Sequence, residues 1–149
     1  MRGAALPYID EHTRVIEADA GEVWRGLVHT LERSFSRPGA ARYARLVGAA
    51  DSAASGPRPL ADGSALPGFR VVSALPGREL ALEGSHRFST YALTFRLDGL
   101  GPRRTRLRAE SRGTFPGVTG GLYRALVLRT GGHALAMRRL LKGIRPRTA

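Results

Sequence analysis

Hydrophobic and polar residues alternate with a period of two along the middle of the chain. Four segments show this pattern, which is typical of strands: 69–74, 79–86, 88–98 and 105–114. The turns between them, at Pro76-Gly77 and at 98–102, are short, and short connections join antiparallel neighbours. In the last two segments the apolar side chains share one face and the charged side chains share the other. The pattern predicts an antiparallel sheet with one apolar and one solvated face.

A shorter strand and a helix are expected before this sheet. Residues 12–17 alternate well enough for a first strand. Asp19 then suits a helix N-cap, and Glu22 lies three residues later, as in a capping box. Apolar residues repeat at helical spacing from Val23 to Leu31, which predicts a helix that ends near residues 31–33.

Two segments between this helix and the sheet are less regular. Residues 40–48 fit a short helix, although 43–47 alone would also fit a strand, and we favour a helix with a strand possible after it. Residues 49–67 are rich in Ala, Ser, Gly, Pro and Asp, which predicts a long, flexible surface loop. Such a loop is a candidate lid.

The last part of the chain, from Leu122 to Ile144, reads as one long helix with polar side chains on the face it should bury. At 100° per residue one narrow sector holds Leu122, Leu126, His133, Met137, Leu140 and Ile144, with Arg129 and Thr130 in or beside it. Polar groups without partners are costly in an apolar core, so part of this face is expected to line a cavity holding water or ligand. Gly131-Gly132 costs about 1 kcal/mol per glycine inside a helix. The pair therefore indicates a wider cavity, close packing on the sheet, or a bend.

One architecture buries all of these apolar surfaces. The final helix must lie across the apolar face of the sheet, and the earlier helices must close one end. This α+β arrangement is the helix-grip fold, formed here by residues 1–149 as a single domain.

The sequence resembles the START-like superfamily, also written SRPBCC, which includes lipid-transfer domains, pollen-allergen-like proteins and polyketide cyclases. The resemblance is carried by 15–31, with Glu22-Val23-Trp24 at the helix start, by 66–71 and 80–84, and by the final helix. The resemblance implies a deep, largely apolar cavity between the sheet and the final helix. Such a cavity binds a lipid, a polyketide, a steroid-like molecule or an aromatic compound. Some members are enzymes and many only bind, so the fold does not decide the function.

Composition removes several kinds of chemistry. The 149 residues include no cysteine, which excludes disulfides, thiolate metal sites and cysteine nucleophiles. The four histidines lack metal-ligand spacing, so we expect no metal and no cofactor. The start of the chain has no apolar run of signal-peptide length, and no later run would span a membrane, so we expect a soluble, cytoplasmic protein.

The net charge of +12 is concentrated in the second half of the chain. Residues 1–75 carry 9 basic and 8 acidic groups (+1), whereas residues 76–149 carry 15 and 4 (+11). Two basic surfaces are expected, one on the wet face of the sheet and one on the final helix: Arg96, Arg106, Arg108 and Arg112, and Arg124, Arg138, Lys142 and Arg145. Either would attract nucleic acid or an anionic membrane surface. Glu110 interrupts the first stripe and no stacking aromatics accompany it, which disfavours nucleic acid.

The predicted cavity has apolar walls and a polar end. The wall residues are Leu93, Phe95, Leu107, Leu126 and Met137, with Trp24 either at the mouth or in the plain core. The polar candidates are Tyr91, Ser111, Arg129, Thr130 and His133. Arg129 and His133 are four residues apart on one helix face, so both would reach the same bound anion. Alternatively, Arg129 extends to the sheet edge and His133 bonds a strand carbonyl.

Catalysis would need a general acid and base in contact with the substrate. The only candidates are His133, or His86 with Tyr91. His86 shares the inward parity of Leu80 and Leu82, but the parity changes between Phe88 and Tyr91, which requires a bulge or turn near Ser89-Thr90. No inward carboxylate accompanies them, because Glu83 and Glu110 fall on the wet face among arginines. The sequence therefore favours a protein that binds or carries a small hydrophobic molecule. The alternatives are a cyclase or dehydratase using the same cavity and a basic module for nucleic acid or membrane.

Overall fold

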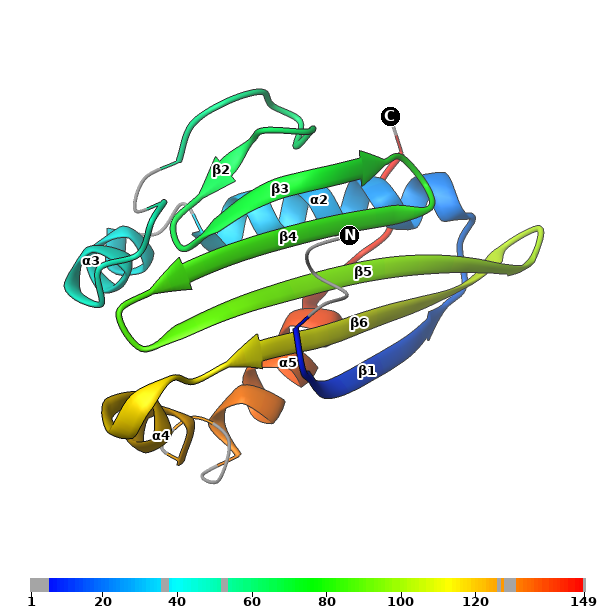
Figure 1. Ribbon diagram of the computed structural model, residues 1–149. Helices are drawn as coiled ribbons and strands as arrows, with labels where there is room; N and C mark the ends of the chain where they lie inside the picture. The colour runs from blue at the N-terminus through cyan, green and yellow to red at the C-terminus, as the bar shows by residue number, and fades with distance from the viewer. Residues whose placement is uncertain (1–5, 36–37, 52–53, 126, 128–130, 149) are drawn as a thin grey trace.

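The computed structural model describes residues 6–35, 38–51, 54–125, 127 and 131–148. Its elements, in chain order, are β1 (Tyr8–Ile16), α2 (Ala20–Phe35), α3 (Pro38–Leu46), β2 (Ala65–Leu66), β3 (Phe69–Leu75), β4 (Glu79–His86), β5 (Ser89–Gly101), β6 (Arg104–Thr114), α4 (Gly117–Arg124) and α5 (Gly132–Gly143). The strands form one antiparallel sheet in the order β1-β6-β5-β4-β3-β2 (Figure 1).

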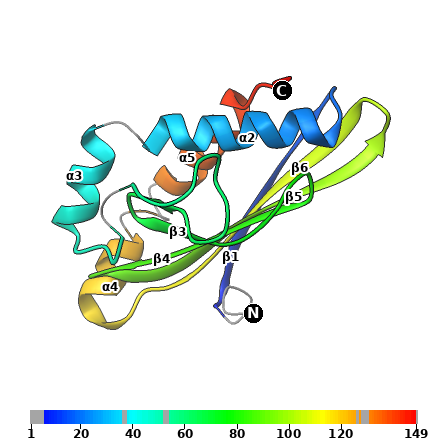
Figure 2. The same cartoon turned by 90° about the horizontal axis from the view of Figure 1, so that it is seen from above.

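Both α2 and α5 cover the same face of the sheet, which confirms the α+β helix-grip arrangement (Figure 2). The sequence placed the first helices at one end only, whereas α2 runs along the sheet. Its apolar stripe is buried against the inner side chains of β5 and β6; the core includes Val23, Trp24, Leu27, Val28, Leu31, Phe95 and Leu107. The Asp19 carboxylate accepts a hydrogen bond from the N–H of Glu22 at 2.8 Å, as expected of a helix N-cap. Among the described residues no helix is both long and apolar enough to cross a membrane.

The strand predictions are confirmed with small changes at the ends. Burial alternates along β5 and β6, so their apolar residues face the helices and their charged residues face outward. β1 begins at Tyr8 rather than His12, and residues 40–48 belong mostly to a helix, α3. In β4 even-numbered residues face inward up to His86, and in β5 odd-numbered residues face inward from Ser89. This change comes from a two-residue turn between the paired His86 and Ser89, not from a bulge.

The prediction of one long final helix was wrong. α4 ends at Arg124, and α5 begins only at Gly132, after Gly131 adopts a left-handed conformation (φ 75°, ψ 6°). Glycine takes this conformation without a steric penalty. A 100° count holds only within an unbroken helix, and Leu122 accordingly is 69% exposed instead of buried. The predicted inward face is correct inside α5, where Met137 is buried. It is also correct at Ile144, which directly follows α5 and is fully buried.

The segment 49–67 is not a plain surface loop. Its last two residues before Pro67 form β2, and Ser55 and Ala65 exchange two backbone hydrogen bonds of 3.1 and 2.8 Å. Leu60 and Ser64 are buried. The carboxylate of Asp62 accepts a hydrogen bond from the N–H of Ala74 at 2.7 Å, which ties the segment to β3. A lid role for this segment stays a prediction.

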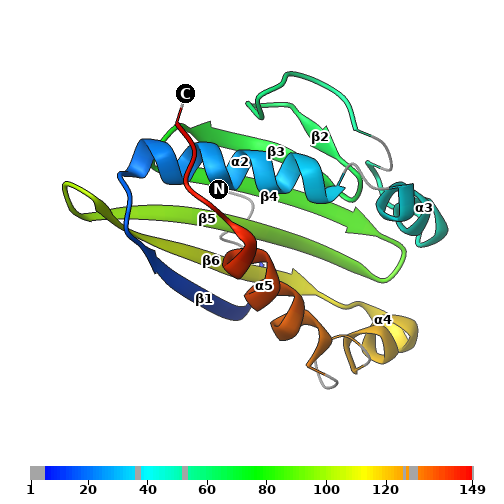
Figure 3. The same cartoon turned by 180° about the vertical axis from the view of Figure 1, so that it is seen from behind.

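The chain after α5 fastens the helices to each other and to the sheet. The Arg14 guanidinium, on β1, donates hydrogen bonds to the carbonyls of Leu141 (2.5 Å), Lys142 (3.3 Å) and Ile144 (2.8 Å). These are the carbonyls that a helix C-terminus leaves unpaired. The tail then crosses α2 (Figure 3), where a Cβ at Gly26 would lie 2.0 Å from a backbone oxygen of the tail. α5 is therefore fixed against both layers.

Candidate functional site

A cavity of about 830 Å³ lies between the inner face of the sheet and the helices. This is the size of a typical small-molecule site. Its wall is mainly apolar and aromatic and takes residues from every helix and from β3 to β6: among them are Phe35, Tyr43, Ala44, Val47, Phe69, His86, Ser89, Tyr91, Leu93, Ser111, Phe115, Tyr123, His133, Met137 and Leu140.

Aromatic rings are concentrated where α3, α4 and the strands meet. Phe69 contacts Phe35 and Tyr91 edge to face, with centroids 5.4 and 5.2 Å apart. His86 lies 5.4 Å from the Tyr91 ring and 5.0 Å from the Tyr123 ring. Such offset and edge contacts match the ring quadrupoles. This part of the wall presents ring faces and edges to a ligand.

Tyr91 is held by its own hydroxyl. The Tyr91 hydroxyl donates a hydrogen bond of 2.5 Å to the carbonyl of Gly68, and the side chain passes over Gly84, the residue that pairs with Tyr91 on the neighbouring strand. A Cβ at Gly84 would lie 2.1 Å from that carbonyl oxygen and 2.5 Å from the tyrosine ring, so only glycine fits. Burial raises the pKa of Tyr91 to about 12. The hydroxyl therefore stays protonated at neutral pH and serves to position the ring, which weakens its case as an acid or base.

His86 faces the cavity as a neutral hydrogen-bond donor. Its Nδ1 accepts a hydrogen bond of 3.1 Å from the N–H of Phe88, which leaves the proton on Nε2. Burial lowers the pKa of His86 and so favours the uncharged ring.

His133 has a carboxylate partner that the sequence did not reveal. Its Nε2 lies 3.1 Å from the hydroxyl oxygen of Ser111 and 3.3 Å from Oδ1 of Asp10. The other Asp10 oxygen lies 3.1 Å from Nε2 of His12. Asp10 was missed because β1 begins four residues before the predicted strand, at Tyr8. A strand predicted to start earlier would have placed Asp10, His12 and Ile16 on one face.

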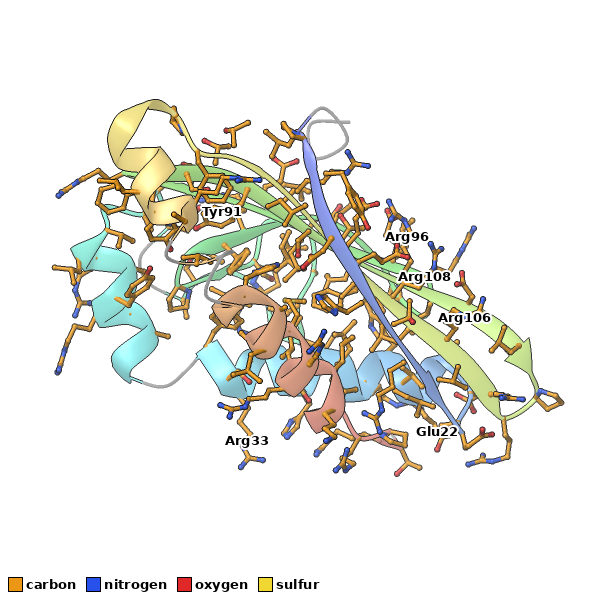
Figure 4. The ribbon with its side chains drawn as sticks, turned by 90° about the horizontal axis from the view of Figure 1, so that it is seen from below. Glu22, Arg33, Tyr91, Arg96, Arg106 and Arg108 are labelled. Carbon is orange, nitrogen blue, oxygen red and sulfur yellow. The ribbon has the colours of Figure 1, made fainter. Side chains whose placement is uncertain are left out.

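Arginines supply the charged part of the wall. Arg33, Arg139, Arg145 and Arg147 come from α2, α5 and the tail, and Arg112 also contributes although Glu110 pairs with it on the outer face. Among the described residues that line the cavity there is no aspartate or glutamate. Figure 4 shows Tyr91 at the sheet and Arg33 in the helix layer. The described cavity wall thus combines aromatic rings with arginines and includes no acidic residue.

The predicted site residues divide into three groups. Five lie on the cavity wall: Tyr91, Leu93, Ser111, His133 and Met137, as does His86. Phe95 and Leu107 are buried in the core instead, because α2 covers that part of the sheet, and Trp24 takes the second of its two predicted positions, in the core. Leu126, Arg129 and Thr130 lie outside the described residues.

The wall also holds aromatic residues that the sequence analysis did not select. Phe35, Phe69 and Tyr43 are among them, as is Tyr123. Tyr123 was not predicted on the wall, because a single long helix would place it at the flank of the inward-facing sector. Phe69 shares the strand parity of buried Val71, and this signal was present in the sequence.

The outer face of the sheet carries ion pairs. Carboxylates contact its arginines: Arg96 with Glu79 at 3.2 Å, Arg108 with Asp98 at 2.7 Å, and Arg112 with Glu110 at 3.0 Å. Of these carboxylates the sequence predicted only Glu110. Figure 4 shows Arg96, Arg106 and Arg108 along this face. Hydrogen bonding to Arg112 is the main cause of a lowered pKa at Glu110. The stripe is a mixed-charge surface, which does not favour a nucleic-acid module.

No protein-family model matches the chain, and no curated protein matches it. Solved structures do. CalU16 from Micromonospora echinospora is 18% identical with a TM-score of 0.55, over 95% of this chain and 85% of that one. The ZhuI aromatase/cyclase from Streptomyces sp. R1128 is 15% identical with a TM-score of 0.53, over 94% and 96%. Truncated norcoclaurine synthase from Thalictrum flavum is 12% identical with a TM-score of 0.52, over 91% and 92%. At these identities the likeness is one of fold.

Proposed function

We propose that this chain, which has the helix-grip fold of the START-like (SRPBCC) superfamily, binds one small hydrophobic molecule with an acidic group. The observation that carries the proposal is the cavity of about 830 Å³, whose wall is chiefly apolar and aromatic. A cavity of this size in a chain of 149 residues removes packing contacts from the core. Occupation by an apolar ligand restores those contacts.

The wall chemistry supports a ligand with one aromatic part and one anionic part. The rings of Phe69, Tyr91 and Tyr123 offer edge and face contacts. Arg139 on α5 lines the cavity, and the described wall contains no carboxylate to neutralise it. A carboxylate or phenolate fits this charge, whereas a cationic ligand would be repelled.

A matched pair of fluorescent probes tests the charge preference. We expect the aromatic sulfonate 8-anilino-1-naphthalenesulfonate to bind more tightly than N-phenyl-1-naphthylamine, which has the same rings without the anion. Arg139→Gln should weaken sulfonate binding about fivefold, near the 1 kcal/mol that one partly solvated charge contributes, and leave the neutral probe unchanged. Arg138→Gln is the control, because Arg138 is the next residue on α5 and is not part of the wall. Equal losses for both probes would contradict an anion site, and no binding of either probe would contradict the ligand cavity.

Native mass spectrometry of the purified protein adds an independent test. A retained small molecule with an aromatic or aliphatic body and an acidic group is the expected result. Retention of a cationic molecule would exclude the proposed ligand class.

A second candidate function is acid–base catalysis on the bound molecule, by an enzyme of the cyclase or dehydratase kind. The contact of His133 with Asp10 favours it, because a carboxylate that accepts the Nε2–H leaves a lone pair on Nδ1 for proton abstraction. The cavity lining reaches this histidine, and Ser111 beside it is buried.

Proton exchange tests this role without knowledge of the natural substrate. In D₂O, we expect the protein to accelerate deuterium uptake at the methyl group next to the carbonyl of 2-acetonaphthone, as followed by NMR. His133→Gln should slow that exchange about a hundredfold. Tyr91→Phe is the control, because the Tyr91 hydroxyl is bound to Gly68. Exchange that does not respond to His133→Gln removes this histidine from any catalytic role.

A further inference from the structure

The two most exposed large aliphatic side chains among the described residues lie at one end of the molecule. Leu46 on α3 is 73% exposed, and Leu122 on α4 is 69% exposed. We call this end the α3–α4 face; it comprises Arg42, Tyr43, Arg45, Leu46, Arg87, Leu122 and Arg124. Exposed apolar side chains that lie at one end and are surrounded by polar residues mark a candidate interaction site.

Three segments of the chain meet at this face. The hydroxyl groups of Tyr43 and Tyr123 lie 2.6 Å apart and join α3 to α4. The N–H of Arg87, in the turn between β4 and β5, donates to the carbonyl of Val47 at 2.7 Å. α4 packs on the same turn, because a Cβ at Gly120 would lie 3.1 Å from the carbonyl oxygen of Phe88. Figures 1 and 2 show α3 and α4 together at this end of the sheet.

The α3–α4 face is purely cationic. Its four arginines are all exposed: Arg42, Arg45, Arg87 and Arg124. The sequences of α3, α4 and the turn at 87–88 contain no acidic residue. This differs from the outer sheet face, where carboxylates lie against the arginines.

Part of the cavity wall belongs to this end of the molecule. Tyr43 lines the cavity and is also 49% exposed, and its hydrogen-bond partner Tyr123 lines the cavity too. The α3–α4 face and the cavity wall therefore share Tyr43, and the leucines and arginines of the face lie outside the wall itself.

We propose that the α3–α4 face docks on an anionic lipid bilayer. Leu46 and Leu122 enter the boundary between headgroups and acyl chains, and the arginines contact lipid phosphates, as in interfacial binding generally. Single leucines that project among arginines suit shallow insertion, and they would have no role on a nucleic-acid backbone. The proposal goes beyond ligand binding: it gives an apolar ligand a way to enter or leave the cavity without crossing water.

Vesicle sedimentation tests the docking. We expect the protein to bind vesicles of phosphatidylcholine with phosphatidylglycerol, and to bind weakly to phosphatidylcholine alone. Leu46→Ser and Leu122→Ser should each weaken binding about tenfold, because each removes one leucine side chain that leaves water when the protein docks on the bilayer. Arg42→Gln and Arg45→Gln should each weaken binding about fivefold. Added salt should weaken binding by the wild type and have less effect on the arginine variants.

Matched controls use α5, which also carries exposed residues. Leu135→Ser removes a leucine that is 48% exposed, and Arg138→Gln with Lys142→Gln removes two positive charges. These variants should bind vesicles as the wild type does. Failure of the wild type to bind anionic vesicles would overturn the proposal, as would equal losses in the α5 variants or retention of RNA instead of vesicles by this face. The α3–α4 variants should still bind the naphthalene probes, which separates this result from the test of the cavity.

Discussion

The arginines on the outer face of the sheet and those around the cavity have opposite surroundings. On the outer face a carboxylate lies within 3.2 Å of Arg96, of Arg108 and of Arg112. Around the cavity, Arg139 and its neighbours face a described wall without any carboxylate. The net charge of +12 is therefore available to an anionic partner only in certain places. The position of each arginine, more than the total charge of the protein, decides which positive charges an anionic ligand can contact.

The two sides also differ in how tightly they are built. The inner side has backbone contacts that admit no extra atom, as at Gly84, whereas the outer side has solvated ion pairs. Substitutions on the inner side should therefore cost more than substitutions on the outer side.

The largest effect is expected at Gly84. Gly84→Ala puts a methyl group against the Gly68 carbonyl and the Tyr91 ring, which should lower the free energy of unfolding by about 3 kcal/mol. Gly99→Ala, at a site with no atom within 4 Å, should leave it nearly unchanged. Urea denaturation measures both. Similar values for the two variants would show that the close contacts at Gly84 do not limit the side chain there.

A smaller effect is expected at Tyr91. Loss of the hydrogen bond to Gly68 in Tyr91→Phe should cost about 1 kcal/mol at neutral pH. Because burial raises the pKa of Tyr91 to about 12, its stabilising contribution is complete below the unfolded value of about 10 and is lost as pH rises toward 12. The difference between wild type and Tyr91→Phe should therefore shrink above pH 10, which denaturant titrations along a pH series would show. A constant difference would mean that the hydroxyl is solvated.

The smallest effect is expected at Glu110 on the outer face. Glu110→Gln removes ion pairs with Arg112 and Arg96 and should cost about 0.5 kcal/mol at pH 7. The lowered pKa of Glu110 means that its contribution is present above the unfolded value of about 4.3 and is lost as pH falls through the lower folded value. The difference between wild type and variant should thus shrink as pH falls below the unfolded value of about 4.3. A changed affinity of Glu110→Gln for the naphthalene probes would show that the outer face and the cavity are not independent.

Local patterns predicted most of the fold. β6 alternates along its whole length, β5 alternates from Leu93 to Asp98, and α2 combines an N-cap at Asp19 with a regular apolar stripe. Both signals lie within one element, so tertiary contacts do not override them. The prediction of one long final helix failed because Gly131, in the left-handed conformation, interrupts the helix. The spacing of apolar residues gives no sign of a left-handed glycine.

The cavity wall was predicted only where one element decides which side chains face inward. Tyr91, Ser111 and His133 reach the cavity because the parity of their own strand or helix points them inward. Phe95 and Leu107 share that parity, yet they lie in the core, since the position of α2 over the sheet is a tertiary property. The contact between Asp10 and His133 joins residues 123 positions apart and has no local signal.

The clamp of Arg14 on α5 has a consequence for the order of folding. Its hydrogen bonds join groups separated by 127 and 130 positions, so the entropy of closing nearly the whole chain opposes their formation until late. We expect β1 to join the sheet slowly, after the β3–β6 meander has formed. During that interval β6 is an open strand edge, and an open edge recruits other chains. Refolding at high protein concentration should therefore lose material to aggregation at this step.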